Sequence, residues 1–125
     1  MKYILVTNNR KVYNFYKETD EVIYLKEGRF MDVLDLVRDK IHKGHTLLTD
    51  PIMSNIADSK NPYKSIAISS SAHIMDEKSM KFIEGAHSVA EKLEENGGGE
   101  KLSEEKLKEY RYVDLNLIRE WVKGV

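Results

Sequence analysis

Short apolar runs alternate with helical segments along this chain, and the alternation restricts the fold more than any other feature. Tyr3–Val6 is a continuous run of β-forming residues, closed by the polar triplet Thr7–Asn9. Comparable runs occupy Glu21–Lys26, His45–Thr49 and Ser65–Ser69. Continuous apolar runs are typical of strands that are buried on both faces. The pattern therefore predicts four strands.

Helical periodicity fills the remaining segments, with apolar residues three and four positions apart. The helical signals cover Arg10–Glu18, Phe30–Ile41, a long segment from the N-cap Asp76 to a break at Gly97–Gly99, a start at Ser103, and Tyr112–Val125. Strands that alternate with helices favour parallel pairing through right-handed crossovers. We therefore expect residues 1–125 to form a single α/β domain, a three-layer sandwich. Its sheet should be small, mostly parallel and four-stranded, with helices on both faces.

Composition excludes several kinds of chemistry and several partners. The chain has no cysteine, so disulfides, thiolate nucleophiles and Cys-based metal sites are excluded, and a cytoplasmic location is expected. Its 20 basic and 21 acidic residues give a net charge of -1, which argues against a nucleic-acid partner. The basic and aromatic stretch around Tyr110–Tyr112 lies among acidic residues that would repel phosphate. No apolar run approaches the roughly 18 residues of a membrane span.

Polar residues follow the expected strands, and in parallel sheets ligands bind at the carboxyl ends of the strands. If the strands are parallel, these residues meet at one edge and line a pocket for a small polar or anionic ligand. The expected ligand-binding residues are Asn8, Asn9, Ser69, Ser70, Ser71 and Lys60, with Lys64 as an alternative source of charge. The alternative interpretation is that such residues merely form turns.

His73 follows the Ser69–Ser71 run and precedes a helix, so it is the best acid–base candidate, because the pKa of histidine ordinarily lies near neutrality. Asp50, in the loop after the third run, is the candidate that would orient it. His42 and His45 have a spacing found in metal sites, but Gly44 separates them by ending a helix. No glycine-rich phosphate motif occurs, and no metal or cofactor is expected.

Four parts of the chain carry a family resemblance: Tyr3–Asn9, Val37–His45 with Leu47–Thr49, Asn61–Ser65 and Val113–Ile118. In these segments the chain resembles the GrdX family of small proteins. It implies association with the glycine, sarcosine and betaine reductase systems of amino-acid-fermenting anaerobes, which form acetyl phosphate from glycine. It implies no established catalytic activity. Where the family's long loop often has His-Pro-Leu-Ser-Gly-Ser, this chain has Asp50-Pro51-Ile52-Met53-Ser54-Asn55.

Two functional hypotheses follow. The resemblance implies an accessory or regulatory protein of the glycine reductase system that binds a partner, such as a reductase subunit, or a small anionic metabolite. The alternative is a small enzyme or ligand-binding module for a phosphorylated or amino-acid-like substrate, with His73 and Asp50 as catalytic residues and Asn8 and Ser70 as binders. An alanine-lined helix and Trp121 also suggest a homodimer.

Overall fold

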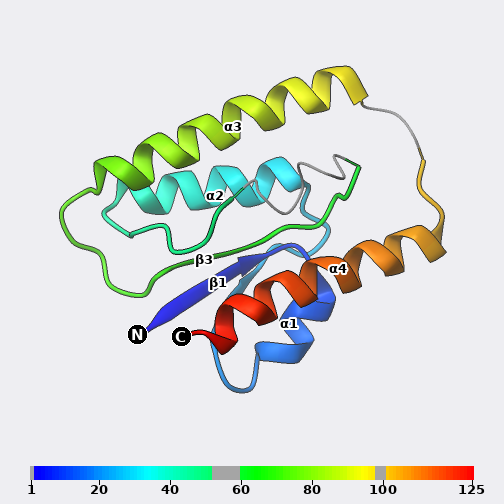
Figure 1. Cartoon of the computed structure of the whole chain (residues 1–125), viewed down its shortest axis with the longest axis horizontal. Coiled ribbons are helices and arrows are strands. Elements are labelled where there is room, and N and C mark those ends of the chain that lie inside the picture. The colour runs from blue at the N-terminus through cyan, green and yellow to red at the C-terminus, as the bar shows by residue number, and fades with distance from the viewer. Residues whose placement is uncertain (1, 52–59, 98–100) are drawn as a thin grey trace.

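The computed structural model describes residues 2–51, 60–97 and 101–125 (Figure 1). Its elements in chain order are β1 (Tyr3–Thr7), α1 (Arg10–Tyr16), β2 (Glu21–Tyr24), α2 (Phe30–His42), β3 (Ser65–Ser69), α3 (Glu77–Gly97) and α4 (Glu104–Lys123). The N-caps Asp76 and Ser103 are confirmed, since their side chains accept from the backbone N–H groups of Ser79 and Lys106. None of the helices in the described ranges has the length and apolarity needed to cross a bilayer.

The sheet has three strands in the order β2-β1-β3. β1 and β2 are parallel, with Leu5 opposite Val22, whereas β1 and β3 are antiparallel, with Thr7 opposite Ser65. The expectation of a mostly parallel, four-stranded sheet is therefore wrong, although the α/β class is consistent with the structure. Parallel neighbours need a crossover connection, and α1 supplies one only between β1 and β2.

The expected strand at 45–49 is reduced to an irregular segment beside β3. Leu47 forms an isolated antiparallel bridge with Ile68, and the Leu48 N–H donates to the Ala67 carbonyl at 2.9 Å. The Ser69 N–H also donates to the Thr46 carbonyl at 2.8 Å, but two other N–H groups donate to side chains: that of Leu47 to Ser79 Oγ at 2.9 Å, and that of Ala67 to Thr49 Oγ1 at 3.1 Å. Serine and threonine hydroxyls compete with backbone carbonyls for N–H groups, so a regular ladder does not form.

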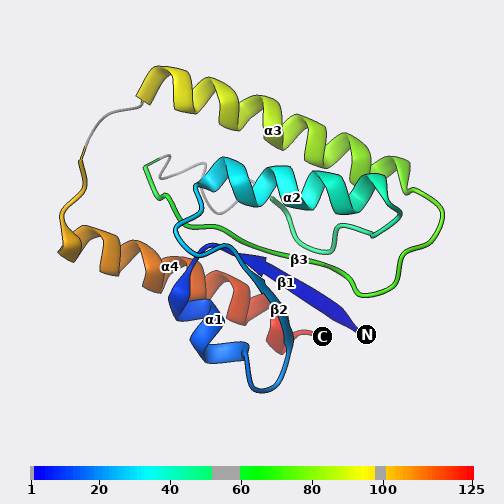
Figure 2. The same ribbon diagram turned by 180° about the vertical axis from the view of Figure 1, so that it is seen from behind.

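Helices cover both faces of the sheet, as expected (Figures 1 and 2). Side chains alternate along a strand, so Ile4 and Val6 pack with α2 and α3, whereas Leu5 packs on the other face with α1 and α4. Ile66 and Ile68 of β3 add to the first layer, and Ala67 adds to the second. The sheet therefore separates the α2–α3 layer from the α1–α4 layer.

The features that suggested a homodimer are used inside the chain. Ala86 and Ala90 of α3 are buried in the core against α2. Trp121 of α4 packs edge-on against Tyr3, with 5.1 Å between the ring centroids. Small side chains here allow two helices of the same chain to approach each other, so they are no evidence for a second copy.

Candidate functional site

The direction of β3 divides the expected site into two. Because β3 is antiparallel to β1, its first residue Ser65 lies beside Thr7, and its last residue Ser69 lies beside Tyr3. The two ends of a five-residue strand are about 13 Å apart, at about 3.3 Å per residue. Ser69–Ser71 therefore follow the opposite end of the sheet from Asn8 and Asn9. The expectation that one pocket gathers all these residues is wrong.

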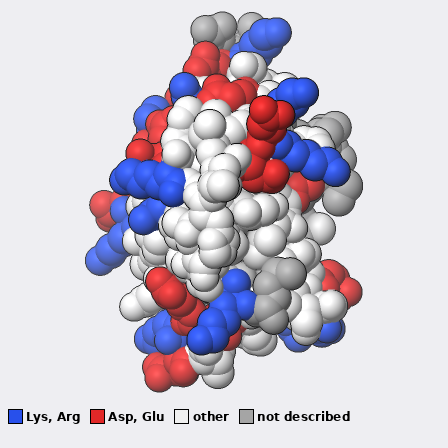
Figure 3. All heavy atoms as spheres, turned by 90° about the vertical axis from the view of Figure 1, so that its left-hand side faces the viewer, with Lys and Arg blue, Asp and Glu red and all other residues white. Residues whose placement is uncertain are grey.

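The serines after β3 are engaged in local structure. Ser69 Oγ accepts from the Thr46 N–H at 2.8 Å and donates to the Ser71 carbonyl at 2.9 Å. The Ser70 N–H donates to the Lys2 carbonyl at 3.3 Å. The following segment ends in Ile74, whose exposed fraction is 93%. Figure 3 views the molecule from this end and shows uncharged atoms across the middle of the face, with charged side chains around them.

His73 and Asp50 are not brought together. His73 is exposed, and among the described residues no hydrogen bond joins it to Asp50. Its backbone N–H donates to the carbonyl of Gly44 at 3.0 Å, which fixes the segment after β3 against the end of α2. Asp50 instead lies close enough to Lys64 for its charge to oppose the lowering of that lysine's pKa by burial. The acid–base pair expected from the sequence is therefore not assembled.

A buried polar cluster lies at the other end of the sheet. Its members are Thr7, Asn8, Asn9, Asn61, Lys64, Ser65 and Asp114. Asn8 joins three chain segments: its Nδ2 donates to the carbonyls of Gly28 and Pro62 at 3.0 and 2.9 Å, and its Oδ1 accepts from the Lys64 N–H at 2.9 Å. The Asn8 amide is thus fully occupied within the protein. Lys60 precedes this cluster and is exposed.

Asn9 and Asp114 connect α1, β3 and α4. Asn9 Oδ1 caps α1 by accepting from the Lys11 N–H at 3.0 Å, and its Nδ2 donates to Asp114 Oδ2 at 3.0 Å. Ser65 donates to the same carboxylate twice, from its N–H at 3.0 Å and its Oγ at 2.7 Å. The exposed fraction of Asp114 is only 3%. This carboxylate is therefore the centre of the cluster.

Burial shifts both charged groups of the cluster toward their neutral forms. It raises the pKa of Asp114, and this effect outweighs the hydrogen bonds from Asn9 and Ser65 and the charge of Lys64. It also lowers the pKa of Lys64, whereas the charges of Asp114 and Asp50 act in the opposite direction. Asn8, Asn9, Ser65 and Asp114 bond mainly to one another and to the backbone, so this part of the cluster holds the elements together.

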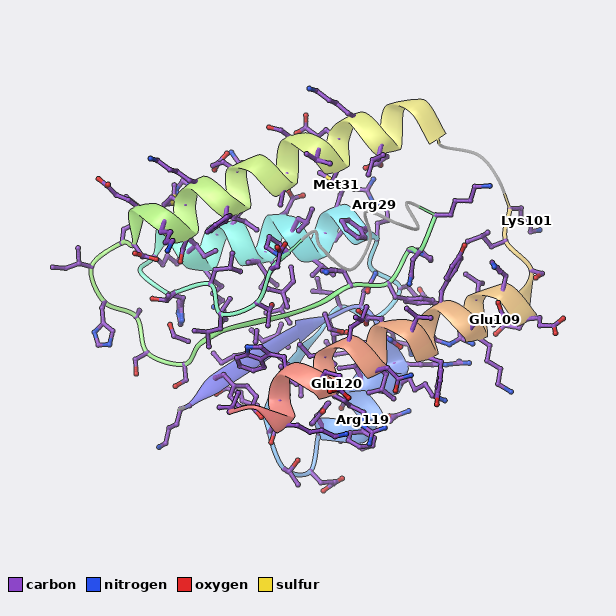
Figure 4. The ribbon with its side chains drawn as sticks, in the orientation of Figure 1. Arg29, Met31, Lys101, Glu109, Arg119 and Glu120 are labelled. Carbon is purple, nitrogen blue, oxygen red and sulfur yellow. The ribbon has the colours of Figure 1, made fainter. Side chains whose placement is uncertain are left out.

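An open cavity lies next to the polar cluster, between α1 and α4. It has a volume of about 330 Å³ and is lined by Arg10, Lys11, Asn14, Glu104, Lys108 and Arg111. We call it the basic cavity, because four of its six lining residues are cationic and one is acidic. Figure 4 shows α1 and α4 side by side, with Arg119 of α4 directed toward α1, where its guanidinium lies 5.0 Å from the Phe15 ring centroid.

Arg111 is the best-fixed cation of the basic cavity. Its Nη1 donates to Tyr63 Oη at 2.8 Å and its Nη2 to Glu104 Oε1 at 2.9 Å. Its carbonyl accepts from Asn9 Nδ2 at 2.9 Å, which ties the cavity wall to the polar cluster. The polar cluster therefore holds the backbone of Arg111, whose guanidinium lines the cavity. This contact connects the polar cluster to the basic cavity.

Sequence reasoning missed the basic cavity, although two signals pointed to it. The first turn of α1 holds Arg10 and Lys11 and no acidic residue, a placement that the helix dipole disfavours. Lys108 and Arg111 are three residues apart on α4 and so share one helix face. The acidic excess of the surrounding segment concealed this pair, because a net charge does not separate the faces of a helix.

The two histidines with metal-like spacing have different partners. His42 Nε2 lies 3.3 Å from Glu84 Oε1, and His45 Nδ1 lies 2.7 Å from the Ser69 carbonyl. Within the part of the chain that the structure describes, no group of three His, Asp or Glu side chains could hold a metal ion.

Fold and site together define a small α/β protein with a mixed sheet, a buried polar junction and a cationic cavity beside it. The chain belongs to the GrdX-like protein family, whose family model matches residues 4–123. No curated protein and no solved structure matches the chain. Residues 52–59, which include most of the loop that departs from the family's usual pattern, lie outside the described residues.

Proposed function

We propose that this chain is an accessory or regulatory protein of a glycine reductase system and that it binds a small anionic metabolite in the basic cavity. Membership of the GrdX-like family supports the link to the reductase. The observation that carries the proposal is the concentration of Arg10, Lys11, Lys108 and Arg111 around one open cavity.

The size of the basic cavity suits a small metabolite. A volume of about 330 Å³ is at the lower end of the range for ligand pockets, roughly 300 to 1,000 Å³. Acetyl phosphate and inorganic phosphate are anions of suitable size, and an amino acid of suitable size is a zwitterion that carries a carboxylate. Glu104 is the one carboxylate of the cavity, and it would accept from the ammonium group of an amino acid. The ammonium group of glycine would thus donate to Glu104, whereas phosphate has no such group.

The charges of the basic cavity favour an anion. Among the described residues, no carboxylate is within ion-pairing distance of Arg10, Lys11 or Lys108, whereas Arg111 pairs with Glu104. Unpaired cations around a concave surface raise the local concentration of anions and retain them. Arg111 adds a guanidinium that Tyr63 and Glu104 already hold in place, so its ordering costs little on binding.

The enzyme alternative receives no support from the geometry. It requires His73 and Asp50 side by side, and Asp50 lies toward Lys64 at the other end of β3. We therefore assign no catalytic role to either residue in this proposal.

Calorimetric titration at low ionic strength tests the ligand part of the proposal. The probes are acetyl phosphate, inorganic phosphate, glycine and acetate. Lys108→Ala should weaken the binding of the best anion at least tenfold, because it removes a cavity cation without touching the polar cluster. Lys123→Ala is the matched control, since Lys123 is an exposed lysine of the same helix. The ligand part is wrong if none of these probes binds at millimolar concentration, or if Lys108→Ala binds as tightly as the unchanged protein.

A pull-down from an anaerobe growing on glycine tests the reductase part. The tagged protein should retain reductase subunits that bare beads do not. Their absence, with the protein folded and expressed, would remove the association while leaving anion binding intact.

A further inference from the structure

The outer face of α3 carries an apolar stripe that has no partner within the described chain. Residues at positions 83, 86 and 90 are buried in the core against α2. One position earlier along the helix, Phe82 and Val89, together with Leu93, form a second row at spacings of seven and four. Their exposed fractions are 55, 43 and 43%. Such spacing places the three side chains on one face over about three helical turns.

Gly85 lies on the same face, and no contact within the described chain requires a glycine at this position. A Cβ added there would meet nothing within 4 Å. The residue is exposed in the interior of a long helix, where glycine is unfavourable compared with alanine. A missing side chain in an open stripe leaves room for the backbone of another helix to come close. The glycine therefore marks the middle of the stripe as a place of close approach.

A row of cations borders the stripe on its solvent side. Lys81 and Lys92, with Ser88 between them, each precede a residue of the stripe by one position. No ion pair in the described ranges involves Lys81 or Lys92. The acids Glu84 and Glu91 lie on the side toward α2, where Glu84 pairs with Arg38 and Glu91 with His87. The stripe is thus edged by unpaired positive charge.

We infer that the outer face of α3, formed by Phe82, Gly85, Val89 and Leu93 with Lys81 and Lys92, docks an amphipathic helix of a partner protein that carries acidic residues beside its apolar face. Helix-in-groove recognition uses apolar anchors at these spacings and complementary charge at the rim. A second copy of this chain is the wrong occupant. A two-fold interface places the same patch against itself, which would bring the two lysine rows together.

This docking face is distinct from the basic cavity, because α3 and the α1–α4 pair lie on opposite faces of the sheet. A protein that binds a metabolite on one side can therefore hold a partner on the other. The inference does not depend on the metabolite, and either can fail without the other.

The test uses two designed helical peptides of 18 residues with identical leucine faces, one flanked by glutamate and one by lysine. Fluorescence anisotropy should give the glutamate peptide at least tenfold tighter binding than the lysine peptide. Hydrogen exchange should show protection by the glutamate peptide over residues 81–93. Gly85→Gln should weaken the binding at least tenfold while raising thermal stability, since it blocks close approach and improves the helix. The double variant Lys81→Glu with Lys92→Glu should reverse the preference between the peptides.

Leu117→Glu is a control outside the docking face, because Leu117 lies on α4 and has the same exposed fraction as Leu93 of the stripe, 43%. It should leave binding of the glutamate peptide unchanged. Equal binding of the two peptides, or no binding of either, would overturn the inference. So would a dimer in sedimentation experiments that Gly85→Gln converts to a monomer, since the occupant would then be a second copy.

Discussion

Replacement of Asp114 by alanine tests whether one buried carboxylate holds the polar cluster together. Asp114 accepts from the Ser65 N–H, from Ser65 Oγ and from Asn9 Nδ2. Only Ser65 Oγ has a second acceptor, Thr7 Oγ1 at 2.7 Å, because the other hydrogen of Asn9 Nδ2 already donates to the Arg111 carbonyl at 2.9 Å. The Ser65 N–H would remain buried without its side-chain acceptor.

The magnitude follows from these contacts. An unsatisfied buried N–H costs about 1 to 3 kcal/mol. Lys64 also loses an opposite charge that favours its ionised form, which adds to the loss. Two effects act in the opposite direction. The variant removes a carboxylate whose charged form is disfavoured by burial. Alanine also has a better helix propensity than aspartate, by about 0.5 kcal/mol. The net expectation for Asp114→Ala is a loss of about 2 kcal/mol in the free energy of unfolding.

Urea unfolding at pH 7 measures this loss, with Asp114→Asn as the informative comparison. The asparagine oxygen can still accept from the Ser65 N–H, so this variant should lose about 1 kcal/mol or less. Glu109→Ala is the control, because Glu109 is an exposed carboxylate of the same helix (Figure 4) and should change stability by less than about 0.5 kcal/mol. If Asp114→Asn loses as much as Asp114→Ala, the negative charge is what matters, and the hydrogen-bond reasoning is refuted.

Three further predictions follow from the same contacts. Gly44→Ala should lower stability by about 2 kcal/mol, because Gly44 has a φ of 104° and an added Cβ would overlap the His73 carbonyl oxygen. Gly85→Ala should instead raise stability by about 0.5 to 1 kcal/mol, because an added Cβ meets nothing there and alanine is favoured within a helix. Thermal unfolding of both variants measures the difference, and a stable Gly44→Ala would contradict the close packing. Asn8→Ala should cost about 3 kcal/mol, since it removes one buried and two partly buried hydrogen bonds. Chemical denaturation measures the loss, with Asn14→Ala, at an exposed asparagine of α1, as the control. Burial raises the pKa of Asp114 above its ordinary 3.8, so the folded chain binds this proton more tightly than the unfolded chain. Its favourable contribution is therefore complete below pH 3.8 and disappears as the pH rises through the raised pKa. Unfolding free energies at several pH values should show the unchanged protein losing stability relative to Asp114→Asn over that window, and a flat difference would contradict the shift.

Local patterns predicted the helices well where the apolar periodicity extends over several turns or where a capping residue marks the start. The apolar stripe of Phe30–Ile41 gave α2, and the caps Asp76 and Ser103 gave the starts of α3 and α4. These signals depend on neighbours within one or two turns, so a single sequence contains them. Glu104–Lys123 is one continuous helix where the sequence suggested two segments.

The direction of β3 relative to β1 was predicted wrongly. No helical period was found between the expected strand at 45–49 and Ser65–Ser69. Parallel neighbours usually need a crossover helix, and the segment at 45–49 instead forms an antiparallel bridge to β3 through Leu47 and Ile68. An apolar run has the same pattern in both directions, so the pattern does not give the orientation of a strand relative to its neighbours.

The sequence by itself determined the α/β class, the starts of α3 and α4 and the family of the chain, because periodicity, caps and motifs are properties of neighbouring residues. The tertiary structure alone decided the direction of β3, the burial of Asp114 beside Asn9 and Ser65, and the meeting of Arg10 with Arg111 around one cavity. These pairs are about 50 to 100 residues apart in sequence. Whether they meet depends on which strands pair and in which direction, and no local pattern records that choice.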